Sequence, residues 1–181
     1  MTGKTHLAAG AALAGWSVFL LAPELTPIGI LIGGFAGLLP DLDASESKLQ
    51  NIPLQIGGRH GIRLRLFKIP GIIFNKLFRH RGPLHSLLSL IILGIILTLL
   101  PLPPVLILAA GVGFLSHLLL DGLTPSGVPL FYPVQQRVRL SPFFKIKTGG
   151  MIDQLVFLIL AMSVVLLAFQ LSQQGINKFL P

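Results

Sequence analysis

Five long apolar runs dominate this sequence of 181 residues and limit what it can fold into. They cover about residues 7–22, 27–39, 84–100, 104–121 and 154–171. Hydrophobic residues make up 52% of the chain and charged residues 11%, which lies outside the range of soluble domains. Whether the second run crosses a membrane completely stays open, because it is short and rich in glycine. We expect an all-α integral membrane protein, with about five transmembrane helices in one bundle and residues 1–181 forming a single domain.

Basic residues are concentrated between these runs and predict an orientation. If all five runs cross, Lys4 and the segments 44–83 and 122–153 place thirteen of the fourteen basic residues on one side. Basic loops stay in the cytoplasm, so we expect a multi-pass protein of the plasma (inner) membrane, with its N-terminus inside and its C-terminus outside. The net charge of +8 suits anionic lipid headgroups as partners and requires no nucleic acid.

His117 and Asp121 are the clearest candidates for a functional site. They lie four residues apart at the end of an apolar run, so an imidazole and a carboxylate share one face of the expected helix. In a soluble protein such a pair is usually a helix-end ion pair, but in an apolar membrane protein it suits a metal ion. The chain has no cysteine, so imidazole and carboxylate groups must supply any metal ligands.

Asp41 and Asp43 follow the second run and form a second candidate cluster. Two carboxylates this close repel each other unless a positive charge lies nearby, and a divalent cation supplies that charge compactly. The alternative is an acidic end to a helix with no further role.

A third cluster, His80, Arg81 and His85, precedes the third run. Pro83 suits the first turn of a helix, which would place His85 inside that turn and let both histidines face one point. Arg81 suits an anionic oxygen, or alternatively anchors the loop in the cytoplasm.

The predicted topology places all of these clusters on the cytoplasmic side, together with His6 at the start of the first run and Asp153 before the fifth. Helix ends that meet at one interface can build one shared site. The candidate metal ligands are His6, Asp41, Asp43, His80, His85, His117, Asp121 and Asp153.

Several motifs resemble the YdjM-type (LexA-regulated) family of membrane-bound metal-dependent hydrolases. They are Thr5-His6, Leu39-Pro40-Asp41-Leu42-Asp43, His80-Arg81-Gly82-Pro83-Leu84-His85-Ser86, Ser116-His117 with Asp121, Leu123-Thr124-Pro125-Ser126-Gly127, and Gly149-Gly150-Met151-Ile152-Asp153. The resemblance spans nearly the whole chain and implies a helical inner-membrane protein with metal-dependent hydrolase activity. One departure is Asp153, where the family commonly has glutamate.

The order of His and Asp residues is also similar to that of zinc-dependent phospholipase C and nuclease enzymes. We therefore expect hydrolysis of a phosphoester or phosphodiester by a metal-activated water, with phospholipids among the candidate substrates. Zinc is the first choice of metal, and manganese and iron are alternatives. Arg81 would hold the substrate anion, and Asp41 or His85 would act as general base.

Two other classes of function stay open. A non-catalytic membrane scaffold could use the same residues as a structural metal site or as a metal-free polar network. A metal-ion transporter is less favoured, because its site would lie near the middle of the bilayer rather than at helix ends. The sequence leaves open the substrate, the number of metal ions and the oligomeric state.

Overall fold

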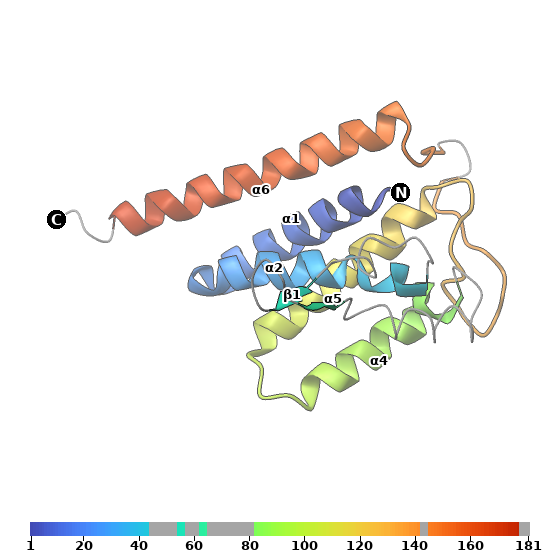
Figure 1. Ribbon diagram of the computed structural model, residues 1–181, viewed down its shortest axis with the longest axis horizontal. Coiled ribbons are helices and arrows are strands. Elements are labelled where there is room, and N and C mark those ends of the chain that lie inside the picture. Colours follow the sequence, from blue (N-terminus) through green and yellow to red (C-terminus); the bar gives the residue numbers. More distant parts are fainter. Residues whose placement is uncertain (44–53, 57–61, 65–81, 142–144, 178–181) are drawn as a thin grey trace.

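The computed structural model describes residues 1–43, 54–56, 62–64, 82–141 and 145–177, which are mainly helical (Figure 1). The α-helices are α1 (Gly3–Leu21), α2 (Thr26–Ala36), α4 (Leu87–Thr98), α5 (Pro104–Gly122) and α6 (Met151–Asn177). The short 3-10 turns η1 (Pro23–Leu25), η2 (Leu39–Asp43) and η4 (Pro83–His85) lie between them. Each of the five apolar runs contains a helix, so the helical fold class is confirmed.

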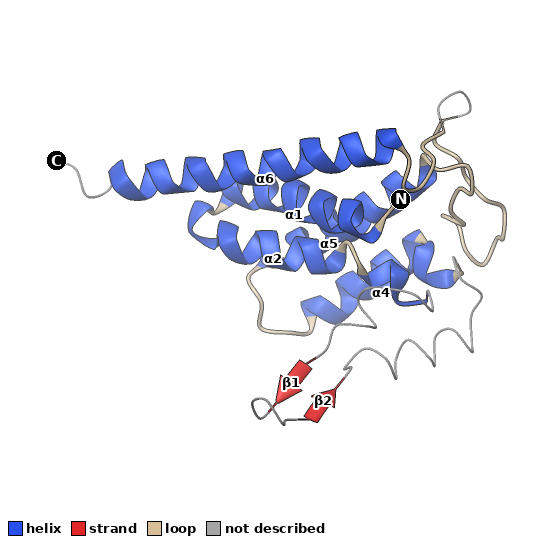
Figure 2. Ribbon diagram, turned by 45° about the horizontal axis from the view of Figure 1, so that its top comes forward, coloured by secondary structure: helices blue, strands red, loops and turns tan. Residues whose placement is uncertain are grey.

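A short hairpin adds two strands to the fold, within the segment that we predicted as the first basic loop. Strand β1 (Leu54–Ile56) pairs antiparallel with β2 (Ile62–Leu64), and Gln55 lies opposite Arg63 (Figure 2). The alternation of apolar and basic residues in β2 has the period of a strand.

The lengths of the helices bear on how many of them cross a membrane. By length and composition, two segments among the described residues are long and apolar enough to span a bilayer, namely Pro104–Gly122 and Met151–Gln174. Helices α2 and α4 have 11 and 12 residues, or roughly 16–18 Å, against a hydrocarbon core of roughly 30 Å. The prediction of five complete crossings is therefore not confirmed by these lengths.

Helices α1, α2 and α5 form the tightly packed centre of the bundle. Glycines let their backbones approach closely, as small residues do in membrane proteins. A Cβ atom built on Gly10 or on Gly113 would lie 2.2 Å from the carbonyl oxygen of Gly33, and one on Gly33 would lie 2.1 Å from the Cβ of Ala14. These three helices therefore hold a nearly fixed separation, and their ends define the position of the site described below.

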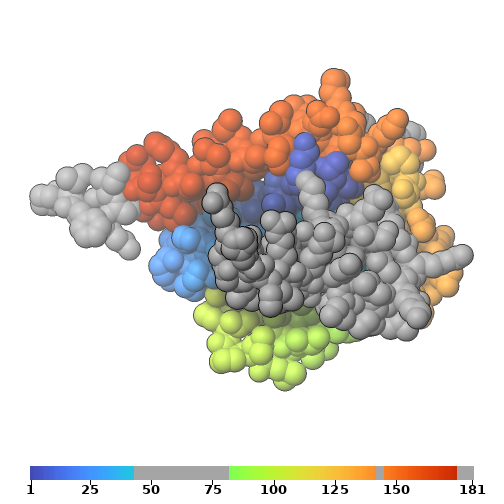
Figure 3. Space-filling view, in the orientation of Figure 1, coloured from blue at the N-terminus to red at the C-terminus, as the bar shows by residue number. Residues whose placement is uncertain are grey.

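Helix α6 lies alongside α1 on one edge of the molecule (Figures 1 and 3). The indole Nε1 of Trp16 donates a hydrogen bond of 2.8 Å to the Oγ of Ser163, and the Nζ of Lys4 lies 4.8 Å from the ring centre of Phe157. Most large apolar side chains of α6 are exposed, as suits a helix that faces lipid.

Helix α4 lies on the opposite edge of the molecule from α6 (Figure 3). None of its residues is fully buried, and its contacts run mainly to α5 and through large side chains. Helix α4 is therefore packed less closely than the glycine-rich centre, and space remains between it and its neighbours.

Candidate metal centre

The side chains of His6, Asp41, His85, His117 and Asp121 meet at one end of the bundle. They come from the first turns of α1, from η2, from η4 and from the last turns of α5, four segments that are far apart in the sequence. Within the described part of the chain, two groups could hold a metal ion: His6, Asp41 and His117 form one, and His85, His117 and Asp121 form the other. Within each group, one ligand atom per residue lies within 4.8 Å of the others. We call these five residues the metal-ligand cluster.

The separations between the ligand atoms fit a common metal ion. The Nε2 atoms of His85 and His117 are 3.3 Å apart. The Nε2 of His117 lies 3.8 Å from Asp41 Oδ1 and 3.8 Å from Asp121 Oδ2. Two ligands of one tetrahedral zinc ion, each roughly 2.0–2.1 Å from the metal, are roughly 3.4 Å apart. The cluster thus needs only small side-chain movements to coordinate an ion.

The tautomer of His117 follows from its contact with the backbone. Its Nδ1 lies 2.8 Å from the carbonyl oxygen of Gly37, which can only accept a hydrogen bond, so Nδ1 carries the proton. In a neutral ring the Nε2 lone pair is then available, and this atom points into the cluster. Metal-ligating histidines commonly donate their second N–H to a backbone carbonyl in this way.

His6 is stacked on His117, with ring centres 3.8 Å apart. Its Nε2 lies 3.1 Å from Asp121 Oδ1, and the amino group of Met1 also contacts that oxygen. The Nδ1 of His6 has no hydrogen-bond partner among the described residues, which a buried ring nitrogen rarely lacks unless it has a further ligand.

Asp41 is the most exposed residue of the metal-ligand cluster. His6, His85, His117 and Asp121 are at most 1% exposed, whereas the Asp41 side chain is 22% exposed and forms the open edge of the cluster. Burial alone would raise the pKa of the Asp41 carboxyl, but the neighbouring imidazoles, that of His85 first, outweigh burial and hold the pKa well below its ordinary value. Asp41 is therefore ionised at neutral pH, as a metal ligand must be.

His85 occupies a different local structure from the one that we predicted. The proline turn Pro83–His85 is a separate 3-10 turn rather than the start of the helix, because Ser86 adopts an extended conformation. Ser86 Oγ accepts a hydrogen bond from the backbone N–H of Ser89 and so caps α4, while the N–H of Leu87 donates to the carbonyl of Leu130. These contacts turn His85 inward, toward the cluster.

Asp153 was predicted as a metal ligand, but its carboxylate has other partners. One oxygen accepts a hydrogen bond of 2.6 Å from the hydroxyl of Thr5, and the other accepts from the backbone N–H groups of Gly149 and Thr2, at 2.7 and 3.1 Å. Asp153 belongs to neither metal-binding group. It joins the start of α6 to the start of α1, next to His6.

Three other predicted site residues cannot be placed in the cluster. His80 and Arg81 lie outside the described residues. For Asp43 the structure describes the backbone, which ends η2. Their predicted roles stay predictions.

Sequence reasoning missed two residues that position the metal-ligand cluster. The carbonyl of Gly37 orients His117, and the hydroxyl of Thr5 binds Asp153. Thr5 directly precedes His6, so a polar neighbour of a candidate ligand was an available signal. For Gly37 no such signal exists, because a backbone carbonyl is common to every residue type.

Known proteins are similar to this chain over most of its length. The family described as YdjM inner membrane protein matches residues 1–177. The chain is 32% identical over 160 residues to the uncharacterized protein YvsG of Bacillus subtilis (strain 168), covering 86% of this chain and 87% of that protein. It is also 32% identical over 171 residues to the inner membrane protein YdjM of Escherichia coli (strain K12), covering 86% and 77% of the two chains.

No solved structure matches the chain. The family match nevertheless extends over almost the whole sequence, and it includes all five residues of the metal-ligand cluster. The chain therefore belongs to the YdjM inner membrane protein family.

Proposed function

We propose that this chain is a metal-dependent hydrolase of the membrane, which cleaves phosphoesters or phosphodiesters. The observation that carries the proposal is the convergence of three imidazoles and two carboxylates, with the Nε2 lone pair of His117 directed into the cluster. Zinc suits this set of ligands best, and manganese and iron are alternatives. A bound ion of this kind would polarise a phosphoryl oxygen and lower the pKa of a water molecule.

The residues around such an ion would divide the remaining work. The residues of the metal-ligand cluster would hold it, except whichever of Asp41 and His85 serves as the base, and four of the five are largely shielded from water. Asp41 lies at the open edge, where substrate and water would enter, and Asp41 or His85 would take the proton from the attacking water. The net reaction breaks a P–O bond, places the water oxygen on phosphorus and gives a proton to the leaving alcohol. Arg81 would steady the anionic substrate.

Metal content is the first test of the proposal. The protein would be purified in detergent without chelators, and its metals would be quantified by mass spectrometry. We expect stoichiometric metal in the wild type and its loss in both His117→Ala and Asp41→Ala. Glu24→Gln is the matched control, because Glu24 is exposed in η1, beyond the opposite end of α2. Wild-type protein that is folded but stays free of metal, even after incubation with zinc or manganese, would exclude a metal centre and leave a polar network.

A second candidate function is a scaffold stabilised by a structural metal. The burial of four of the five ligands favours it, because structural sites are closed. Soluble and lipid-linked phosphoesters would be offered to metal-loaded protein, with the Asp41→Ala variant as background. Hydrolysis above that background supports the enzyme. A metal-loaded protein that hydrolyses none of them, but unfolds at lower temperature after chelation, supports the scaffold.

The proposal includes a topology, in which the chain crosses the membrane several times and carries the metal-ligand cluster on the cytoplasmic face. Its support is the distribution of basic residues, nearly all of which lie in segments on the side of the cluster if the five helices cross. The chain has no cysteine, so single cysteines can be introduced without background. Labelling of Arg137→Cys from inside the cell, and of Ala22→Cys from outside, is the expected result. The reverse pattern would place the site on the outer face.

A further inference from the structure

An apolar cavity of about 360 Å³ lies beside the metal-ligand cluster. Leu42 and Leu84 line it, and they are the sequence neighbours of Asp41 and His85. The buried side of the cavity includes Phe114, which lies about one turn before His117 on α5. The cavity therefore begins next to the cluster, whose own residues do not line it, and extends away along α4, past Ser89 and on to Ile96.

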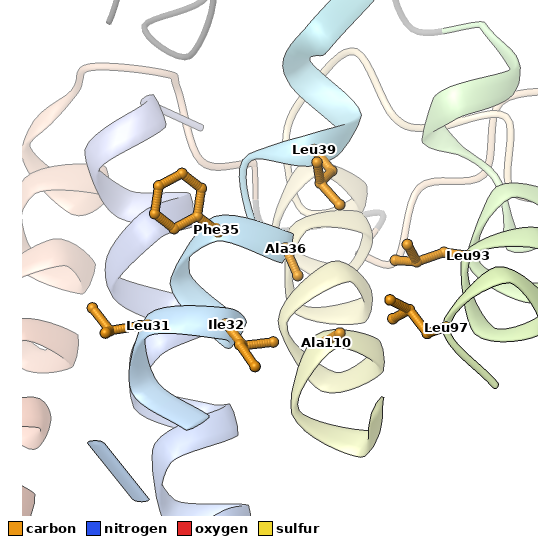
Figure 4. Close-up of a pocket in the computed structure, with 8 residues that line it drawn as sticks. All are labelled: Leu31, Ile32, Phe35, Ala36, Leu39, Leu93, Leu97 and Ala110. Carbon is orange, nitrogen blue, oxygen red and sulfur yellow. The ribbon is translucent and has the colours of Figure 1, made fainter. Parts of the chain in front are cut away.

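A second cavity, of about 310 Å³, continues the first between α2, α4 and α5. The two share Leu39 and Leu93 in their linings. Figure 4 shows Leu93 and Leu97 directed from α4 across the gap toward Ala110 of α5, and Ala36 of α2 beside the same gap. We call the two cavities together the α4 groove.

The packing of α4 explains why the groove exists. Glycines bring α1, α2 and α5 into backbone contact, whereas α4 has no fully buried residue. Ile92 and Ile96 line the groove and are still 47% and 53% exposed, so they form a rim that is open to the side. In a membrane, such an opening faces the hydrocarbon chains of lipids.

The α4 groove has the dimensions of a single hydrocarbon chain. From Ser89 to Leu97 it follows α4 for roughly 12 Å, at roughly 1.5 Å per residue. An extended chain of single bonds advances roughly 1.2 Å per bond, so roughly ten bonds fit this length. The combined volume also lies in the range of ordinary ligand pockets.

We propose that the α4 groove binds one hydrocarbon chain of a lipid whose phosphate-ester headgroup reaches the metal-ligand cluster. This inference rests on the proposed function and narrows it: the substrate is an amphiphile, not a soluble phosphoester. The distribution of polar groups supports this proposal, because ionisable side chains lie near one end of the groove and nearly all the residues that line it are apolar. A lipid presents the same distribution, with a charged ester at one end of an apolar chain.

Three probes separate the contributions of the chain and of the phosphate: dodecyl phosphate, butyl phosphate and dodecanol. Native mass spectrometry of metal-loaded protein released from detergent would give the affinity for each. We expect dodecyl phosphate to bind at least tenfold more tightly than either of the other probes. In Leu93→Trp, which fills the middle of the groove, this advantage over butyl phosphate should fall at least tenfold. Ile91→Trp is the matched control, since Ile91 lies on the same helix, is 57% exposed and lines neither cavity.

The outcomes distinguish this inference from the function on which it rests. If the wild type holds metal but binds dodecyl and butyl phosphate equally, or if Ile91→Trp acts like Leu93→Trp, the groove is not a lipid site and the metal centre is unaffected. Dodecanol binding as tightly as dodecyl phosphate would also overturn the inference, because the phosphate would then contribute nothing. If Leu93→Trp does not fold, Ala110→Leu narrows the groove from α5 and must reduce the chain advantage for the inference to hold. A protein without metal fails the proposed function directly, by its metal content.

Discussion

Replacing Gly113 with alanine tests whether the contact between α2 and α5 positions the metal-ligand cluster. The new Cβ would lie 2.2 Å from the carbonyl oxygen of Gly33, whereas ordinary contact begins at 3.4 Å. The opposing atom belongs to the backbone and a Cβ cannot rotate away, so the two helices must separate by roughly 1 Å. Gly111→Ala is the control on the same helix, because its Cβ would meet nothing within 4 Å.

The two variants should differ in stability by several kcal/mol. Overpacking at Gly113 costs about 1–3 kcal/mol, while alanine in place of Gly111 stabilises the helix by about 0.5–1 kcal/mol. For a chain of this size the unfolding midpoints would then differ on the order of 5–10 °C. The same separation would stretch the 2.8 Å hydrogen bond from His117 to Gly37 past about 3.5 Å, so Gly113→Ala should also bind metal more weakly.

Thermal unfolding in detergent and metal content would be measured on the same preparations. We expect a lowered midpoint and reduced metal for Gly113→Ala, and an unchanged or raised midpoint with full metal for Gly111→Ala. Equal stability and equal metal content in the two variants would refute the reasoning that glycine contacts set the geometry of the site.

Three further predictions concern the contacts around the metal-ligand cluster. Asp153→Asn weakens the hydrogen bonds to a buried carboxylate, so it should lower the unfolding free energy by about 2 kcal/mol and leave the metal content unchanged. Loss of metal from the folded variant would instead identify Asp153 as a ligand. Ser86→Ala removes the cap of α4, which should lower the unfolding free energy by about 1 kcal/mol and weaken metal binding, because His85 is the neighbouring residue. Titration with zinc measures the affinity, and an affinity equal to that of the wild type would contradict the prediction. Ser163→Ala removes the hydrogen-bond acceptor of Trp16, the one tryptophan of the chain, so the tryptophan fluorescence should shift and the unfolding free energy should fall by about 1 kcal/mol. An unchanged emission spectrum would argue against the contact between α1 and α6.

Sequence reasoning predicted that candidate ligands from different helices meet, but it did not predict which groups each side chain contacts. Apolar runs located each α-helix of the described residues, and five of the eight candidate ligands meet at one end of the bundle, as the predicted topology required. Periodicity carries no information about which carboxylate is already bound by hydrogen bonds. Asp153 therefore looked like a ligand, although Thr5 and two backbone N–H groups occupy its oxygens.

The loose packing of α4 against the rest of the bundle could not be predicted from the sequence either. Its residues are apolar on all sides, so no stripe distinguishes a face that packs on protein from a face that meets lipid. The break at Ser86 has the same origin, because a proline turn followed by an apolar run is compatible with one continuous helix or with two pieces. Only the packing against Leu130 and Asp41 decides between them.

The assembly of the metal-ligand cluster from both halves of the chain has a consequence for biosynthesis. His6 is made early, whereas its partner Asp121 follows only after α2 and α4 have been synthesised. The nascent protein therefore cannot complete the metal-ligand cluster until α5 has docked on α1. A metal ion held as proposed would bind only after α5 has docked, so chains that stall before that point would remain metal-free and open to proteolysis.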